Sequence, residues 1–228
     1  MKVILLSIHA MEDDRIRRHI QYLFDVGIDV YYLHYNVTQP ELKAGEFNYA
    51  GAKGFRINPI SFNKIIKKTY LLSPQVYKDS LNALRHLKIS RSDKVILHVH
   101  NPENLKIASK LKKSFFISAS TVYDRHEYYE KYKGFLGIKT LFLMEARHRH
   151  YIDHVILVSD EQKIIAAKLF NHAGFSTVPN YPNGSVYDLD MIDEKITKIK
   201  NNGEIVLSYV GSLYSSFNRD IELLLKIA

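Results

Sequence analysis

The chain has 228 residues, of which 46% are hydrophobic and 25% are charged, with 10 glycines, 6 prolines and no cysteine. This composition excludes disordered and fibrous proteins, and the absence of cysteine excludes disulfide scaffolds, thiolate metal sites and a cysteine nucleophile. At roughly 150 residues per domain, the length corresponds to about one and a half domains. We therefore expect a globular protein with a sizeable core, in a reducing compartment such as the cytoplasm.

The formal net charge of +8 arises from 32 Lys and Arg against 24 Asp and Glu. The excess is local, because residues 61–70 hold three lysines and residues 106–113 hold four. Basic residues mixed with aromatic ones are typical of surfaces that meet nucleic acid, an anionic membrane or an anionic substrate. Solvated helix faces are the alternative for each cluster. Neither cluster lies on a recognisable nucleic-acid recognition element, so we expect no nucleic-acid partner.

The first 35 residues predict a helix between two strands. Residues 2–8 form a continuous apolar run, typical of a strand covered on both faces, and residues 28–35 predict a second strand. The apolar residues of 16–24 have helical spacing, with Asp13 or Asp14 as the N-cap. The N-terminal run is too short for a signal peptide or a membrane span, so we expect a strand there.

The following segments continue this alternation. We expect a polar loop to about residue 54, a short strand near 55–60, one or two helices between 63 and 87, strands at 94–100, 115–124, 154–159 and 175–180, and helices at 102–113, 137–152 and 160–174. Asn101 is the expected N-cap of the helix after 94–100, and Ser159 with Gln162 the expected capping box of a later one. The alternation predicts an α/β, Rossmann-like domain with a mostly parallel sheet and helices on both faces.

A domain boundary is expected after residue 180. Residues 181–203 lose the periodicity and gain Pro, Gly and Asn, as in a linker, whereas residues 204–228 resume with a buried-strand pattern and the beginning of a helix. One strand and part of a helix cannot bury their own apolar faces. The sequence therefore predicts a domain at 1–180, a linker, and the truncated start of a second Rossmann-like domain. We expect a fragment, or a protein whose other half is a separate chain.

Candidate site residues follow the carboxyl ends of the predicted strands, where open parallel sheets bind ligands. They are His9, His100 with Asn101, Asp124 with His126 and Glu127, and Asn180. The strongest group, Asp124 to Glu127, lies among four tyrosines in residues 121–132. A histidine beside carboxylates can act as a general base, and tyrosines with carboxylates commonly line sugar sites. A polar surface loop is the alternative.

Other motifs are absent or weak. The loop after the first strand has no glycine, so neither a dinucleotide-binding fingerprint nor a P-loop is present. His98, His100 and His126 are chelating residue types, but no acidic or cysteine partner is fixed by spacing. We therefore expect no metal site, with His98 as a core histidine.

The order of several motifs is informative as a set. DDRIRRHIQYLFDVGIDVYYL, VILHVHNPENL, TVYDRHEYY, HVILVSDEQ, TVPNYPN and LSYVGSLYSSFNRDIELLLKIA together resemble the GT-B glycosyltransferases of family 4, of the kind that build bacterial cell-surface polysaccharides. The resemblance covers the whole chain. It implies an acceptor-holding first domain facing a second domain that binds a nucleotide-sugar donor, with neither a metal nor another cofactor.

The resemblance also implies roles for individual residues. On the acceptor side, Asp14 with Arg15 matches the D-x-R-type start of the family's first helix. His126 with Glu127 matches its Y-D-x-H-E loop, and Asn180 matches the Asn that ends the first domain.

On the donor side, Gly211 lies where the family turns after its first strand, and Arg219 matches the basic residue that touches the donor diphosphate. Ser212 departs from the Arg that many members carry, so the usual pair of cations is incomplete. The rest of the donor pocket would follow Ala228.

We therefore expect a glycosyltransferase that moves a sugar from a nucleotide-sugar donor to a saccharide or lipid-linked acceptor, and that is inactive as these 228 residues alone. The expected residues are Asp124, His126 and Glu127 for catalysis, Asp14, Arg15, His100, Asn101 and Asn180 for substrate binding, and Gly211 and Arg219 for the donor diphosphate. The basic clusters predict docking on an anionic membrane surface. The alternatives are a non-catalytic acceptor-binding or scaffold subunit and a regulatory or nucleic-acid module.

Overall fold

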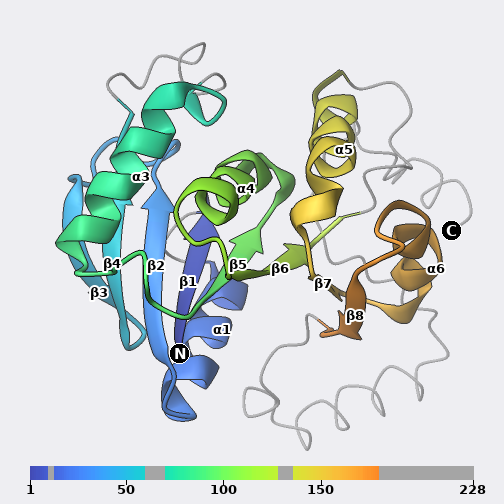
Figure 1. Cartoon of the computed structure of the whole chain (residues 1–228), viewed down its shortest axis with the longest axis horizontal. Helices are drawn as coiled ribbons and strands as arrows, with labels where there is room; N and C mark the ends of the chain where they lie inside the picture. Colours follow the sequence, from blue (N-terminus) through green and yellow to red (C-terminus); the bar gives the residue numbers. More distant parts are fainter. Residues whose placement is uncertain (10–12, 60–69, 128–135, 180–228) are drawn as a thin grey trace, which may run out of the picture. The chain divides into compact units, whose positions relative to one another are not determined.

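The computed structural model describes residues 1–9, 13–59, 70–127 and 136–179, which form a twisted sheet with helices on both faces (Figure 1). Within these residues the sheet has eight strands in the order β3-β4-β2-β1-β5-β6-β7-β8. Their bounds are β1 (Lys2–Ser7), β2 (Asp29–Tyr35), β3 (Gly45–Tyr49), β4 (Ala52–Ile57), β5 (Val95–His100), β6 (Ser120–Arg125), β7 (His154–Leu157) and β8 (Gly174–Thr177). Neighbouring strands are parallel except for the β3–β4 pair.

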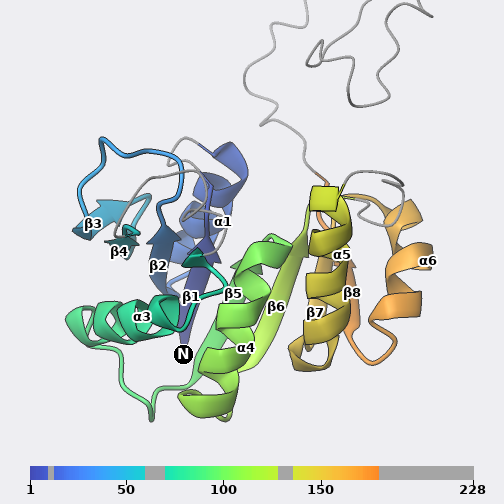
Figure 2. The same cartoon turned by 90° about the horizontal axis from the view of Figure 1, so that it is seen from above.

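The helices are α1 (Asp14–Asp25), α3 (Pro74–His86), α4 (Leu105–Ser114), α5 (Leu136–His148) and α6 (Asp160–Leu169), with 3-10 turns η1 (Pro102–Asn104) and η2 (Arg149–Tyr151). Figure 2 shows α1 on one face of the sheet, and α3, α4 and α5 along the other. The right-handed crossover rule explains this division, because the chain moves one way from β1 to β2 and the opposite way from β5 to β8. The predicted Rossmann-like architecture is confirmed.

Two apolar clusters flank the sheet. On the α1 face, Ile16 and Ile20 lie one helical turn apart and pack against Leu5 of β1. On the other face, Leu97 and Val99 of β5 join the larger cluster with α3 and α4. Side chains alternate between the two faces along a strand. His98 lies between Leu97 and Val99, and His100 follows Val99, so both histidines point to the α1 face. The larger core therefore fixes which face of β5 carries histidine.

Two predicted boundaries are wrong. Residues 45–57, expected mostly as a loop, form the β3–β4 hairpin, turned by Ala50 and Gly51 with φ of 50° and 90°. The polar, half-exposed β3 carries too weak an apolar pattern to be recognised. Residues 115–119 do not belong to β6, because Phe116 is buried in the core directly after α4 and the strand begins at Ser120.

Two predicted caps occupy N-cap positions but do not form the expected side-chain hydrogen bonds. Asn101 makes no side-chain cap hydrogen bond; the chain passes through η1 before α4 begins at Leu105. Ser159 precedes α6 but likewise makes no side-chain cap bond, and Gln162 instead accepts from the backbone nitrogen of Val158 at 3.4 Å. Helix α6 ends at Leu169 rather than near Gly174, which begins β8. The predicted linker and second-domain start, at 181–228, lie outside the described residues.

Candidate functional site

The carboxyl ends of β5 and β6 lie side by side beneath α1. Their register pairs His100 with Asp124, and paired residues of a sheet present their side chains to the same face. Helix α1 is fixed above this point by its N-cap, since Asp13 accepts hydrogen bonds from the backbone nitrogens of Arg15 and Ile16 at 3.0 and 3.2 Å. The capped first turn thus places Arg15 over the ends of both strands.

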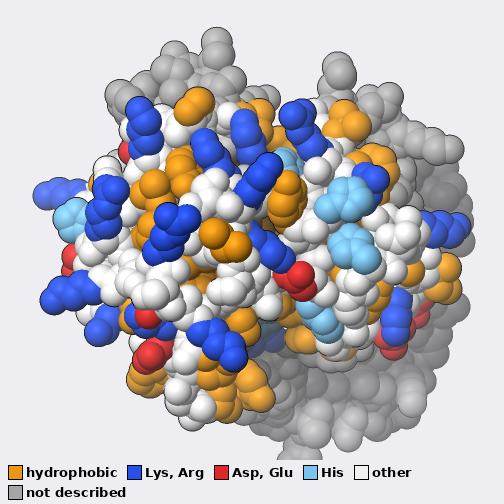
Figure 3. Space-filling view, in the orientation of Figure 1, with side chains coloured by type: hydrophobic (Ala, Val, Ile, Leu, Met, Phe, Trp, Pro, Cys, Tyr) orange, Lys and Arg blue, Asp and Glu red, His pale blue; other side chains and the backbone are white. Residues whose placement is uncertain are grey.

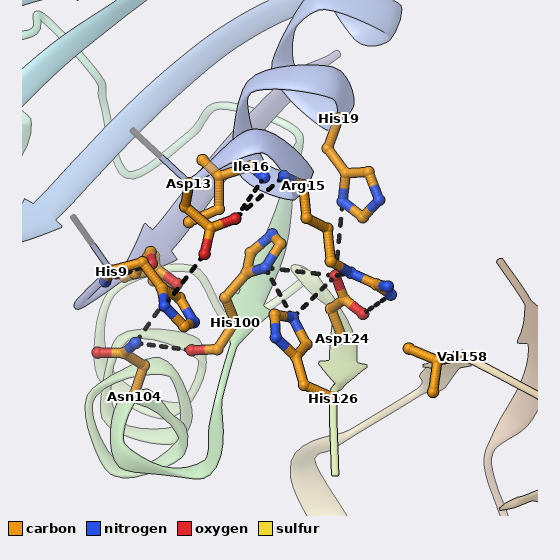
Figure 4. Close-up of polar contacts among 12 residues, drawn as sticks. His9, Asp13, Arg15, Ile16, His19, His100, Asn104, Asp124, His126 and Val158 are labelled. Atoms are coloured by element: carbon orange, nitrogen blue, oxygen red, sulfur yellow. Dashed lines mark hydrogen bonds and ion pairs between the residues drawn. The ribbon is translucent and has the colours of Figure 1, made fainter. Parts of the chain in front are cut away.

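Asp124 is the centre of the site (Figure 4). It is fully buried, and Arg15 donates to it twice, from Nε to Oδ2 at 2.9 Å and from Nη2 to Oδ1 at 2.5 Å. Three imidazole nitrogens approach the same Oδ2: Nδ1 of His100 at 3.3 Å, Nε2 of His126 at 3.4 Å and Nδ1 of His19 at 3.5 Å. One carboxylate therefore joins α1, β5 and the end of β6.

Burial and hydrogen bonding determine which side chains of this group are charged. Burial alone would raise the pKa of Asp124, but the hydrogen bond from His126, together with the Arg15 guanidinium, holds that pKa well below its usual range. Burial lowers the pKa of His100 well below its usual value and that of His98 to about 4. At neutral pH the site thus contains an ionised Asp124 paired with Arg15, next to the uncharged imidazoles of His98 and His100.

His126 connects this buried group to the surface. Its side chain is 18% exposed, whereas those of Asp124 and His100 are 0% exposed. It stacks on His9, with ring centroids 5.4 Å apart, and His9 in turn pairs with Asp13 at 3.2 Å. Because a carboxylate can only accept, Nε2 of His126 donates to Asp124 and Nδ1 carries the lone pair in the neutral ring. That nitrogen is suited to accept a proton from a substrate hydroxyl.

Glu103 is a site residue that the sequence analysis missed. It lies in η1, directly after β5, and its Oε2 is buried without a hydrogen-bond partner among the described residues. Burial raises its pKa, and the nearby His9 and His126 act in the opposite direction. Its position just past a strand's carboxyl end was the available signal.

The predicted residues separate into two groups. The structure brings together Arg15, His100, Asp124 and His126. Asp14 is not part of this group, because its 58% exposed side chain is held by Arg17 at 2.5 Å on the outer side of α1.

Three more predicted residues, Asn180, Gly211 and Arg219, lie outside the described residues. Glu127 is exposed just beyond the end of β6. The structure therefore does not test the roles predicted for these four residues.

Asn101 has an unusual backbone next to the site, with φ of 67° and ψ of 151°. Only glycine adopts this region without strain, which costs other residues about 1–3 kcal/mol. We expect Asn101→Gly to be at least about 1 kcal/mol more stable than Asn101→Ala, because alanine keeps the strained Cβ. Urea unfolding followed by circular dichroism measures this difference. Equal stability of the two variants would contradict the strain.

His34 of β2 makes the fold sensitive to acid. It is fully buried, its Nδ1 accepts from Nε of Arg56 at 3.4 Å, and burial followed by the charge of Arg56 lowers its pKa to about 4. The unfolded chain binds a proton at this residue below about pH 6.5, whereas the folded chain does so only near pH 4. Stability is therefore expected to fall between these values, by about 1.4 kcal/mol per pH unit from His34.

The pH dependence of urea unfolding checks this expectation. His34→Gln should flatten the dependence between pH 6.5 and 4 relative to the unsubstituted chain. His86→Gln, at a side chain that is 62% exposed, is the matched control and should leave the slope unchanged. An equal slope in all three proteins would show that His34 takes up its proton at the same pH when folded and unfolded.

A cavity of about 540 Å³ adjoins the Asp124 group on the α1 face. Apolar residues of four strands form its floor: Val3, Ile96, Val122 and Ile156. Arg15 and His19 of α1, together with His98, contribute polar atoms to its wall. The Asp124 group thus lies between this cavity and the strand ends where His126 is exposed.

The face with α3, α4 and α5 carries Lys and Arg side chains spread among apolar ones (Figure 3). Several lysines of α4 are engaged within the chain: Lys106 donates to the carbonyl of Leu72, and Lys110 lies 4.4 Å from the ring centroid of Tyr77. In the part of the chain that the structure describes, no helix is long and apolar enough to cross a bilayer.

The comparisons with known proteins give the class of fold. No family model matches the sequence, and no curated protein has a significant match to it. Among solved structures, the sucrose-phosphate synthase of Thermosynechococcus elongatus has a TM-score of 0.63 at 12% identity, over 80% of this chain and 49% of that one. A second structure of that synthase has a TM-score of 0.56 at 13% identity, over 89% of this chain and 98% of that one.

A structure described as trehalose-6-phosphate from E. coli bound with UDP-2-fluoro glucose has a TM-score of 0.50 at 9% identity, over 88% of this chain and 55% of that one. These neighbours are GT-B glycosyltransferases, so the described domain has the Rossmann-like fold of that class. The chain spans about half the length of the first structure, at 49%.

Proposed function

We propose that this chain is the acceptor-side part of a GT-B glycosyltransferase resembling family 4. In this proposal a sugar moves from a nucleotide-sugar donor to a saccharide or lipid-linked acceptor in cell-surface polysaccharide synthesis. The observation that carries the proposal is the Asp124 group. A buried carboxylate orients a partly exposed His126 at the carboxyl end of β6, in a domain with the GT-B fold.

In the proposed reaction, His126 accepts the proton of the acceptor hydroxyl on Nδ1. Asp124 and Arg15 are positioning residues, since the carboxylate sets the tautomer of His126 and the guanidinium keeps that carboxylate ionised. Glu127 and the partly buried Glu103 lie on the neighbouring segments, where they would contact the acceptor. Nδ1 of His100 lies 3.3 Å from Nε2 of His126.

The donor side of the proposal depends on residues that the structure does not describe. Arg219 and Gly211 would contact the donor diphosphate, where a cation and a backbone amide stabilise the charge of the leaving group. Asn180 would contribute to substrate binding where the first domain ends. The UDP-2-fluoro glucose in one neighbour supports a nucleotide-sugar donor. We propose that the transfer itself needs no metal.

The test is sugar transfer by the protein expressed from its complete reading frame. The protein is incubated with a panel of radiolabelled nucleotide sugars, with and without a lipid extract as acceptor, and label is followed into hydrolysed sugar and into lipid or saccharide. Donor-dependent turnover is expected. The absence of both turnover and nucleotide-sugar binding, measured by calorimetry, would overturn the proposal.

The alternative is a non-catalytic acceptor-binding or scaffold subunit whose partner chain supplies the donor site. This chain covers about half, 49%, of a solved synthase, and this partial coverage supports the alternative. The two proposals differ in one observation: the enzyme turns over a donor by itself, whereas the subunit binds saccharide acceptors but turns over a donor only after a partner chain is added.

Docking on an anionic membrane belongs to the same proposal. The lysines of 61–70 lie outside the described residues, and those of 106–113 lie on the face in Figure 3. Sedimentation with vesicles containing anionic lipid, compared with neutral vesicles, tests it. Equal binding to both kinds of vesicle would exclude an electrostatic surface.

A further inference from the structure

Three imidazoles gather around Asp124 on the α1 face of the sheet, and one of them, His100, also contacts His126. His19 comes from α1, and His98 and His100 come from β5; the three ring centroids lie 4.8 to 5.4 Å apart. One donor atom from each histidine and one from Asp124 lie within 4.8 Å of one another. We infer that His19, His98, His100 and Asp124 form a binding site for a divalent transition-metal ion, with Zn²⁺ as the best match.

Each of the three histidines has one ring nitrogen without a hydrogen-bond partner among the described residues. Nε2 of His98 and Nε2 of His100 are buried without a hydrogen bond among the described residues, and so is Nδ1 of His19. The residues themselves are buried, with exposed fractions of 7% for His98 and 0% for His100. A buried polar atom is normally satisfied, so three such atoms in one cluster call for a ligand that accepts lone pairs. A metal ion is that ligand.

The ligand chemistry selects the metal. Imidazole and carboxylate together suit Zn²⁺, which prefers four ligands in a tetrahedron at about 2.0–2.1 Å. Such bonds place neighbouring donor atoms about 3.3 Å apart. The widest pair, now within 4.8 Å, would close by about 1.5 Å, which side-chain rotation can supply. Histidine binds a metal ion in its neutral form.

Arg15 opposes the ion and shapes its affinity. Its guanidinium donates to both carboxylate oxygens of Asp124, so a bound cation would share Oδ2 through a remaining lone pair and would be repelled by the guanidinium. Access is from the α1 side, because His19 and His98 line the cavity of about 540 Å³. The site is therefore reachable by an ion without opening the sheet.

The number of protein ligands indicates whether the ion has a structural or a catalytic role. With four protein ligands no position remains for a reactive water, which is typical of structural rather than hydrolytic zinc. The ion would join α1 to β5 and β6 and would compete with His126 for Oδ2 of Asp124. We expect the bound form to be more resistant to unfolding. If the proposed transfer is correct, the bound form should also be less active.

Binding is tested on protein stripped with a chelator, independently of any enzyme activity. Titration with Co²⁺ is expected to give the strong visible absorption of tetrahedral cobalt at one ion per chain, and Zn²⁺ should displace it. At a hundredfold excess of Zn²⁺ over Kd, the melting temperature should rise by about 5–10 °C. No absorption and no shift, or only octahedral cobalt, would overturn the inference.

Variants identify the ligands. His98→Asn and His19→Asn should each weaken Zn²⁺ binding by more than the roughly 10–100-fold cost of losing an outer-shell partner. His19 is partly exposed, so its variant keeps the test valid if His98→Asn fails to fold. Arg15→Gln should bind Zn²⁺ about tenfold more tightly. His86→Asn is the matched control, and affinity equal in all these proteins would assign the metal to surface histidines instead.

Discussion

Replacing Glu145 with alanine is expected to lower the free energy of unfolding by about 3–5 kcal/mol. Glu145 of α5 and Arg125 of β6 are both fully buried, and the guanidinium donates to the two carboxylate oxygens at 2.7 and 2.9 Å. The hydroxyl of Tyr123 donates to the same carboxylate at 2.8 Å. Truncation removes the carboxylate to which this buried guanidinium donates two hydrogen bonds. Urea unfolding followed by far-UV circular dichroism measures the loss.

Two further variants control this measurement. Arg85→Ala, on the exposed side of α3, should change stability by no more than about 0.5 kcal/mol. The double variant Glu145→Leu with Arg125→Met should recover most of the loss, because it removes both buried charges together. A loss below about 1 kcal/mol in Glu145→Ala would mean that water reaches the pair.

If the proposed function is correct, replacing His126 with glutamine is expected to lower kcat/KM for sugar transfer by about 10²–10⁴-fold, the usual contribution of a positioned general base. Glutamine can still donate to Asp124, so the arrangement of the buried group and the free energy of unfolding should change little. Transfer is measured with the protein made from the complete reading frame, at saturating and limiting acceptor.

His150→Gln, at an exposed histidine away from the Asp124 group, is the matched control and should retain activity within twofold. Asp124→Asn should also lower kcat, and in addition shift the pH profile, because the orienting charge is lost. Full activity of His126→Gln would remove this residue from catalysis and leave the acceptor-binding role.

The central strands and first helix could be predicted because their patterns are local. β1 is a nearly continuous apolar run, β5 is apolar apart from His98 and His100, and Asp13 caps α1 as its position before the apolar spacing indicated. The β3–β4 hairpin could not be predicted, because its half-exposed residues lack an apolar pattern and its turn depends on the positive φ of Ala50 and Gly51.

The candidate site was partly predictable, because some of its residues follow a pattern that is local in the sequence. The strand-end rule located His100 and Asp124, but nothing in the sequence spacing joins His19 or Arg15 to them. Arg15 and Asp124 are 109 residues apart, and only the register of β5 with β6 and the placement of α1 bring them together. His98 was expected to be a satisfied core histidine, yet its Nε2 has no hydrogen-bond partner among the described residues.

Strand β6 has consecutive charged residues whose partners lie on opposite faces of the sheet. Asp124 pairs with Arg15 of α1, and Arg125 pairs with Glu145 of α5. A shift of β6 by one residue against its neighbours would turn each charge to the face that lacks its partner, leaving two ion pairs broken in the interior. The two pairs therefore select a single alignment of β6 during folding, so the contacts that build the site also exclude misaligned sheets.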